Sequence, residues 1–97
     1  MFGFFRPRVD LSHARRLVEN GGLLLDVRTT AEFAAGHVDS ALNIPVQELA
    51  QRLHELGSKD RPIVVYCRSG ARSASAARLL QAQGFQSVLD IGPMPPW

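Results

Sequence analysis

One unit of the sequence constrains the fold most: an apolar run that ends in a cysteine and continues into a polar loop and a helix. Residues 63–66 (Ile-Val-Val-Tyr) are β-branched or aromatic and predict a buried central strand. Residues 73–83 are rich in Ala, Leu, Arg and Gln and predict a helix that stops at Gly84. Cys67, the only cysteine of the chain, lies between them. The pattern therefore places a thiol at the carboxyl end of a strand, next to the amino end of a helix.

The loop after this cysteine has the composition of an anion-binding site. Its candidate residues are Arg68, Ser69, Gly70, Ala71, Arg72 and Ser73. The amino end of a helix carries unpaired N–H groups and about half a positive charge, which favours thiolate over thiol. The two arginines add charge and donors for an oxyanion, and Gly70 allows a tight turn that points backbone amides inward. A cysteine that only filled a core would not precede such a polar loop, so we interpret Cys67 as a nucleophile.

Length and composition limit the alternatives. With 97 residues, 45% of them apolar and 21% charged, the chain predicts one domain over residues 1–97. The net charge of +2 and the scattered basic residues give little support for nucleic-acid binding. One cysteine excludes an intramolecular disulfide, and the three histidines lack ligand-like spacing, so we expect neither a metal nor a cofactor.

The same numbers bear on where the protein works. No apolar run approaches the roughly 20 residues that span a bilayer, so we expect no membrane span. An unpaired thiol fits a reducing compartment, and we expect a cytoplasmic monomer. Residues 1–8 are aromatic and basic, and we expect an N-terminal arm or strand packed on the domain; a surface anchor or partner-binding arm is the alternative.

The other elements are predicted from short apolar runs and capping residues. They are helices over residues 12–20, 29–36 and 46–56, and strands over residues 23–28, 41–44 and 87–91. Ser12 is the expected cap of the first helix, and Thr29 with Glu32 matches a capping box. Short apolar strands separated by helices imply an α/β fold: a mostly parallel central sheet of about five strands, flanked by helices on both faces. In such sheets ligands bind beyond the carboxyl ends of the strands, where Cys67 lies.

Several motifs occur together, in a fixed order, along nearly the whole chain. They are residues 24–28 (Leu-Leu-Asp-Val-Arg), 32–33 with 36–38, 41–45 (Ala-Leu-Asn-Ile-Pro), 64–73 around the cysteine, and Gly92 with Trp97. In this combination the sequence resembles the rhodanese family of sulfurtransferases. The resemblance implies a single rhodanese-like domain in which Cys67 carries a sulfane sulfur as a persulfide, held by the loop that follows. It also implies transfer from a small anionic donor such as thiosulfate to a thiol acceptor, with a thioredoxin-like protein or a sulfur-relay protein as candidate acceptors.

Four further residues of these motifs are interpreted as structural neighbours of the site. We expect Asp26, Arg28 and Glu32 to form ion pairs and caps, with catalysis by paired charges as the alternative. We expect His37 to be a hydrogen-bonded structural histidine rather than a general base.

The chain departs from the family pattern near its last strand. Many members have a second glycine after the position of Gly92, where this chain has Pro93. Many members also continue into a last helix, which Pro93, Pro95 and Pro96 disfavour here. Residues 92–97 are therefore predicted to form a shortened C-terminal segment that borders the site.

The spacing within the loop separates sulfur transfer from phosphatase chemistry. Cysteine phosphatases have five residues between the cysteine and an arginine, whereas four residues separate Cys67 from Arg72. The shorter loop offers a smaller ring of amides than a phosphoryl group requires. We expect Arg68 and Arg72 to hold the sulfonate of a donor instead. Two alternatives are a sulfur-relay carrier with little thiosulfate activity and a regulatory interaction domain without chemistry; the presence of Cys67 argues against the second.

Overall fold

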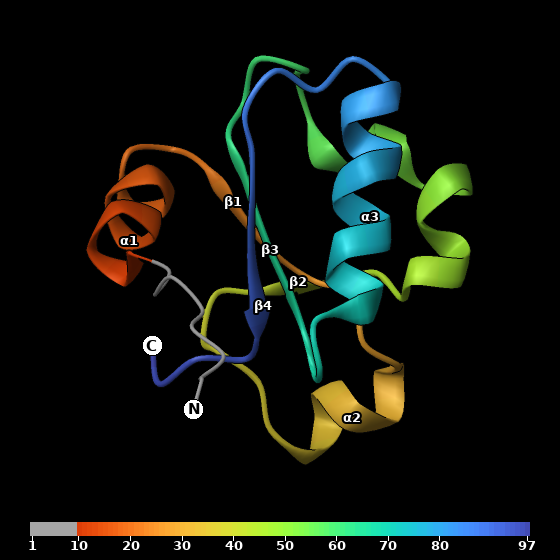
Figure 1. Ribbon diagram of the computed structural model, residues 1–97. Coiled ribbons are helices and arrows are strands. Elements are labelled where there is room, and N and C mark those ends of the chain that lie inside the picture. Colours follow the sequence, from red (N-terminus) through yellow and green to blue (C-terminus); the bar gives the residue numbers. More distant parts are fainter. Residues whose placement is uncertain (1–9) are drawn as a thin grey trace, which may run out of the picture.

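The computed structural model describes residues 10–97, so the arm predicted over residues 1–8 lies outside the described part of the chain. The elements are α1 (Leu11–Glu19), β1 (Leu23–Asp26), α2 (Thr30–Ala35), β2 (Leu42–Asn43), the 3-10 helices η1 (Val46–Gln51) and η2 (Leu53–Leu56), β3 (Ile63–Cys67), α3 (Ala71–Ala82) and β4 (Val88–Pro93). The strands form one parallel sheet in the order β2-β1-β3-β4 (Figure 1). The predicted α/β class is confirmed. Within residues 10–97, no helix combines the length and the apolar character needed to cross a membrane.

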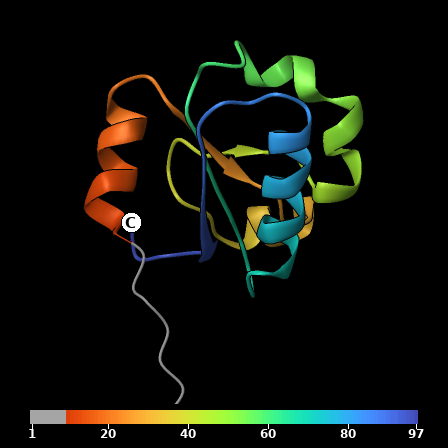
Figure 2. The same cartoon turned by 45° about the horizontal axis from the view of Figure 1, so that its top comes forward.

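Helices cover both faces of the sheet, as predicted. Figure 2 shows α1 on one side of the strands and α3 with the two 3-10 helices on the other. Successive side chains of a strand point to opposite faces, so the apolar run of β3 supplies two cores. Val64 and Tyr66 pack in the same cluster as Ala14 of α1. Cys67 lies in the other cluster, together with Leu80 of α3. The strand pattern therefore turns the cysteine toward the helix that follows it.

Two predictions about the sheet and the first helix differ from the structure in detail. Residues 10–97 contain four strands rather than about five, and residues 1–8, for which an arm or a strand was expected, lie outside this range. The cap of α1 is Asp10 rather than Ser12. A carboxylate oxygen of Asp10 accepts hydrogen bonds from the backbone N–H groups of Ser12 and His13, at 3.0 and 3.2 Å. The acidic side chain two residues before Ser12 satisfies the first amides of the helix.

Residues 46–56 form two short 3-10 helices instead of one amphipathic α-helix. The chain bends at Arg52, where φ is −123° and ψ is 19°. The Arg52 guanidinium forms salt bridges with Glu48 and Glu55, one on either side of the bend. Leu49 and Leu56 remain fully buried, so the predicted apolar face is preserved although the helix type is not.

The carboxyl ends of the four parallel strands meet at one edge of the sheet, where α2 also lies (Figure 1). β4 ends beside the cysteine: Pro93 is the register partner of Cys67, and the Met94 N–H donates to the Cys67 carbonyl at 2.8 Å. No helix follows β4 in the described residues, as the prolines predicted. The segment instead reaches α1, where the Arg15 Nε donates to the Trp97 carbonyl at 3.1 Å and the guanidinium lies 5.9 Å from the indole centre.

Candidate active site

Cys67 is the last residue of β3, and its side chain is fully buried. Its Sγ accepts a hydrogen bond from the Gly70 N–H at 2.9 Å. The hydroxyl of Ser73 lies 3.4 Å from the same sulfur and donates to the Gly70 carbonyl at 3.1 Å. When the sulfur is a thiolate, the hydroxyl can rotate and donate to it instead. The sulfur at the end of β3 therefore lies within the turn that follows it, close to the hydrogen-bond donors of that turn.

The tight turn depends on Gly70. This residue caps α3 with φ at +104°, in the left-handed region that glycine occupies without steric cost. α3 begins at Ala71, two residues before the predicted start, so the amino end of the helix is part of the loop itself. Ser73, Ala76 and Ala77 are buried on the face of α3 toward the sheet. Their small side chains allow the helix to pack closely and bring its unpaired amides to the sulfur.

Opposing effects act on the charge of Cys67. Burial raises the pKa of the thiol, whereas hydrogen bonds from the Ser73 hydroxyl and from the backbone amides of Ser73, Gly70 and Ser69 lower it. The hydrogen bonds outweigh burial, and the pKa of Cys67 lies below its ordinary value. A larger fraction of the sulfur is therefore thiolate at neutral pH, which is the nucleophilic form.

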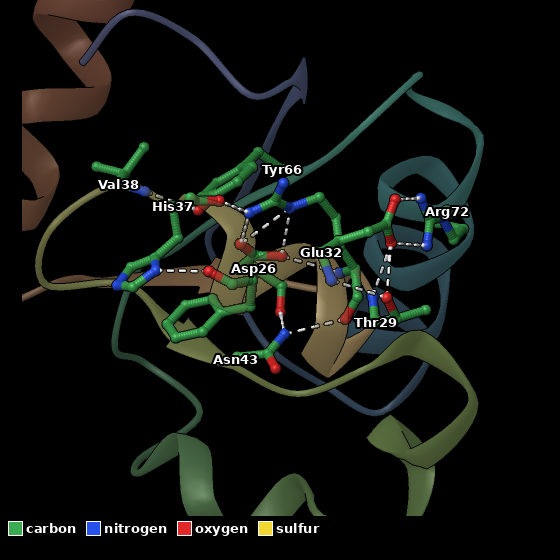
Figure 3. Close-up of polar contacts among 11 residues, drawn as sticks. Asp26, Thr29, Glu32, His37, Val38, Asn43, Tyr66 and Arg72 are labelled. Carbon is green, nitrogen blue, oxygen red and sulfur yellow. Dashed lines mark hydrogen bonds and ion pairs between the residues drawn. The ribbon is translucent and has the colours of Figure 1, made fainter.

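The two loop arginines have different surroundings. The Arg72 guanidinium donates two parallel hydrogen bonds to the Glu32 carboxylate, at 2.7 and 3.0 Å (Figure 3). Glu32 also completes the predicted capping box with Thr29 at the start of α2. The hydrogen bond from Arg72, followed by that from the Thr29 N–H, lowers the pKa of Glu32 to about 2. Arg68 is exposed and forms no hydrogen bond or salt bridge with residues 10–97. Arg72 thus joins α3 to α2, whereas Arg68 is available to a ligand.

Asp26 and Arg28 form the ion pair that the motif predicted. The Asp26 side chain is fully buried, and the Arg28 side chain is 7% exposed. Figure 3 shows the carboxylate of Asp26 beside Tyr66, and the Arg28 guanidinium lies 5.6 Å from the Tyr66 ring centre. The Asn43 amide donates to the Asp26 and Arg28 carbonyls, at 3.0 Å each, and so fixes the loop after β1.

His37 has the structural environment predicted for it. Its Nδ1 lies 2.8 Å from the Phe33 carbonyl, and its ring stacks on the Phe33 ring with centroids 3.6 Å apart. The next residue, Val38, donates its N–H to the Tyr66 hydroxyl at 3.2 Å. These contacts hold the turn after α2 against the sheet.

An open pocket of about 390 Å³ lies beside the cysteine loop. It is lined by Arg28, Glu32, Ala35, Gly36, Arg68 and Met94. Three of these residues, Arg28, Glu32 and Arg68, were candidates from the sequence. Met94 was not named as a candidate, although it lies within residues 92–97, the segment that was predicted to border the site. Gly36 belonged to a motif of the sequence but was not a site candidate, and Ala35 gave no signal, because the placement of α2 over the strand ends depends on contacts distant in sequence.

The rest of the loop faces a second surface hollow. Ser69, Gly70 and Ala71 line a pocket of about 500 Å³ together with residues 90–93 of β4. Pro93 approaches the turn closely: a side chain added at Gly70 would lie 4.0 Å from the proline ring. The chain therefore has a proline packed beside the cysteine loop at the position where the family often has glycine.

Comparison with known proteins identifies the family. The sequence model of the rhodanese-like domain matches residues 10–92. A sulfurtransferase of Allochromatium vinosum is 46% identical over 69 residues, which are 71% of this chain and 64% of the relative. A protein of Bacillus subtilis named as a sulfur carrier, YrkF, is 35% identical over 94 residues, which are 94% of this chain and 50% of the relative. The chain thus spans about half to two thirds of the length of these relatives.

Solved structures agree with this assignment. The human single-domain sulfurtransferase TSTD1 superposes with a TM-score of 0.73 at 30% identity, covering 89% of this chain and 88% of that chain. The match of the family's sequence model, residues 10–92, includes the cysteine loop and the four strands of the described residues, apart from Pro93 at the end of β4. This chain therefore belongs to the rhodanese-like domain family.

Proposed function

We propose that this protein is a sulfurtransferase that moves a sulfane sulfur through a persulfide on Cys67. The observation that carries the proposal is the setting of the sulfur: Sγ lies at the amino end of α3, accepts the Gly70 N–H, and has a pKa below its ordinary value. These features stabilise a thiolate, and they stabilise the anionic persulfide by the same donors.

The reaction takes place in two steps that balance in atoms and charge. In the first, the Cys67 thiolate attacks the outer sulfur of thiosulfate, the S–S bond of the donor breaks with its electron pair, and sulfite leaves. In the second, an acceptor thiolate attacks the outer sulfur of the Cys67 persulfide, and the Cys67 thiolate is released. Covalent catalysis of this kind predicts ping-pong kinetics.

The exposed cation near the cysteine supports an anionic donor. Arg68 follows Cys67 directly and lines the pocket of about 390 Å³. A guanidinium attracts an oxyanion and donates several hydrogen bonds to it. The pocket is too open to select one small donor by shape, so charge selects the class of donor in this proposal.

A second candidate function is a sulfur relay between proteins. The relative from Bacillus subtilis that is named as a sulfur carrier favours it. In a relay, Cys67 would receive sulfur from a protein persulfide and pass it to a protein thiol, and thiosulfate would be a poor donor. Either role requires a reduced thiol, and we place the protein in the cytoplasm for that reason.

Mass spectrometry after incubation with thiosulfate tests the proposal. The wild-type protein should gain the mass of one sulfur atom, lose it on addition of a thiol, and show thiosulfate:cyanide sulfurtransferase turnover. Cys67→Ser should fold and show neither property, because the hydroxyl is a poor sulfur nucleophile. Undiminished turnover of Cys67→Ser would contradict the proposal. A mass gain from a protein persulfide but not from thiosulfate would identify the relay.

A further inference from the structure

Arg28 is held rigidly from one side. Its Nε donates to both carboxylate oxygens of Asp26 at 3.1 Å, and its Nη2 donates to Asp26 Oδ2 and to the Gly36 carbonyl at 2.7 Å each. The side chain is more than nine-tenths buried. A guanidinium carries five N–H donors in a planar fork, and these contacts use only the Nε and Nη2 side of it.

The remaining nitrogen, Nη1, donates no hydrogen bond of ordinary distance and angle within residues 10–97, although the Tyr66 ring lies beside the guanidinium with its centre 5.6 Å away. In the same residues, no side-chain nitrogen or oxygen that is buried lacks a hydrogen-bond partner. It follows that Nη1 is not buried. Arg28 is one of the residues that line the pocket beside the cysteine loop, and Nη1 is the accessible nitrogen of its guanidinium without a partner.

The strand register places Arg28 level with Arg68, the residue that follows the cysteine. Asp26 is the register partner of Tyr66, and the Val27 N–H donates to the Tyr66 carbonyl at 3.2 Å. Continued beyond the end of β1, this register sets Val27 opposite Cys67 and Arg28 opposite Arg68. Two guanidinium groups therefore border one pocket, one of them fixed by a buried carboxylate and the other exposed.

The charges around the pocket favour one small anion. Asp26 balances the charge of Arg28 from the buried side, and Arg72 balances Glu32. Arg68 has no such partner within residues 10–97. The lining of this pocket therefore has one excess positive charge, on Arg68, and one immobilised donor, on Arg28. Both complement the oxyanion end of a small ligand.

We propose that Arg28 Nη1 and Arg68 together bind the sulfonate group of a thiosulfate-type donor, so that Arg28 is a substrate-binding residue as well as the partner of Asp26. This inference rests on the proposed sulfur transfer. As the S–S bond of the donor breaks, negative charge moves onto the departing sulfite, and a donor that is already immobilised stabilises this charge without reorganising. A donor without an oxyanion gains nothing from Arg28.

The test uses Cys67→Ser protein, in which thiosulfate can bind but cannot react. Thiosulfate is titrated into this protein with and without Arg28→Lys, followed by NMR of the loop amides. Lysine keeps the positive charge opposite Asp26 but lacks the second donor arm. The dissociation constant should rise about tenfold or more, as for loss of a hydrogen bond to a charged group. Arg52→Lys, which changes an arginine paired with two carboxylates elsewhere, is the matched control and should leave the constant unchanged.

A second measurement needs no change at Arg28. In ¹⁵N-labelled Cys67→Ser protein, the guanidinium signals of Arg28 and Arg68 should shift on addition of thiosulfate, and those of Arg72 should not. This measurement decides the question if Arg28→Lys fails to fold. Thiosulfate that does not bind, Arg28 signals that do not move, or an affinity that Arg28→Lys leaves unchanged would each overturn the inference.

Activity assays distinguish this inference from the proposed function. In protein that retains Cys67, Arg28→Lys should slow persulfide formation from thiosulfate about tenfold or more, and should leave transfer from an alkyl hydropersulfide, which has no sulfonate group, nearly unchanged. Equal losses with both donors would overturn the role of Arg28 in anion binding. If wild-type protein gains no sulfur from any donor, the proposed function fails, whereas the thiosulfate titration still decides whether the anion subsite exists.

Discussion

At the scale of single residues, Cys67 and Ser73 form the central pair of the site. Burial opposes the charged sulfur, and hydrogen bonds favour it. The Ser73 hydroxyl is the one side-chain donor in this set, and the remaining donors are backbone amides of the loop. The reactivity of the thiol therefore depends on a side chain that can be changed without altering the turn.

Ser73→Ala should raise the pKa of Cys67, because it removes a donor that stabilises the thiolate more than the thiol. The rate of alkylation by iodoacetamide follows the thiolate fraction, so its midpoint should move to higher pH. Ser69→Ala is the matched control: it keeps the backbone amide, which is the group of Ser69 that lowers the pKa. An equal shift in the two variants would show that the serine hydroxyls do not act through this contact.

At the scale of elements, the site is made where α2 and α3 meet the carboxyl ends of the strands. The two helices are joined by Glu32 and Arg72, which are 40 residues apart in sequence. The same carboxylate caps α2, so one side chain both starts its own helix and fixes the helix that follows Cys67. Arg68, in contrast, is exposed and takes no part in this contact between the helices.

Glu32→Gln should lower the melting temperature near neutral pH. Glutamine can still complete the capping box, so the change isolates the loss of the ion pair with Arg72. The pKa of Glu32 falls from 4.5 to about 2 on folding. The stabilisation is therefore fully present above pH 4.5 and is lost as the pH falls toward about 2.

The measurement is the difference in melting temperature between wild type and Glu32→Gln across this range of pH. The difference should shrink as the pH falls from 4.5 to about 2. Glu48→Gln, in an exposed pair with Arg52, is the control and should have a smaller effect. A difference that does not depend on pH would assign the role of Glu32 to capping alone.

These elements also show what the sequence could predict. The capping box was visible because Thr29 and Glu32 are three residues apart, and β3 was visible as a continuous apolar run. The contact between Glu32 and Arg72 was not, since it depends on how two helices are placed over one sheet edge. The bend at Arg52 was missed for a related reason: apolar spacing shows which face is buried, but it does not distinguish one α-helix from two 3-10 turns.

The role of Arg28 illustrates the same limit at the site. Its motif predicted an ion pair with Asp26, and this pair is present. The sequence carried no information on which guanidinium nitrogen is left without a partner, because that depends on the Gly36 carbonyl and on the shape of the pocket. The ion pair of Arg28 with Asp26 was therefore predictable from the sequence, whereas the direction of the unpaired Arg28 Nη1 was not.

At the scale of the whole molecule, the sheet separates two cores that share β3. All five residues of β3 are fully buried, and Cys67 belongs to the core beneath α3. The cysteine loop is therefore anchored by the same packing that stabilises the domain.

Leu80→Ala should lower the free energy of unfolding by about 2–5 kcal/mol, because it leaves a cavity between α3 and the sheet. Leu80 is fully buried in the core that contains Cys67. Met94→Ala, at a residue that is 41% exposed, is the control and should change stability by no more than about 0.5 kcal/mol. Urea denaturation followed by circular dichroism measures both. A cost below about 1 kcal/mol for Leu80→Ala would show that the core closes around the missing side chain.

The contact of Arg15 with Trp97 gives the protein an intrinsic optical reporter. Trp97 is the only tryptophan of the chain, so its indole emission has a single source. The residue lies in the segment that leaves β4, passes Met94 at the wall of the pocket and ends against α1. Detachment of this segment would expose the indole to water and red-shift its fluorescence, while the far-ultraviolet signal of the helices stayed constant. Movement at the rim of the pocket can thus be followed in unlabelled protein and separated from global unfolding.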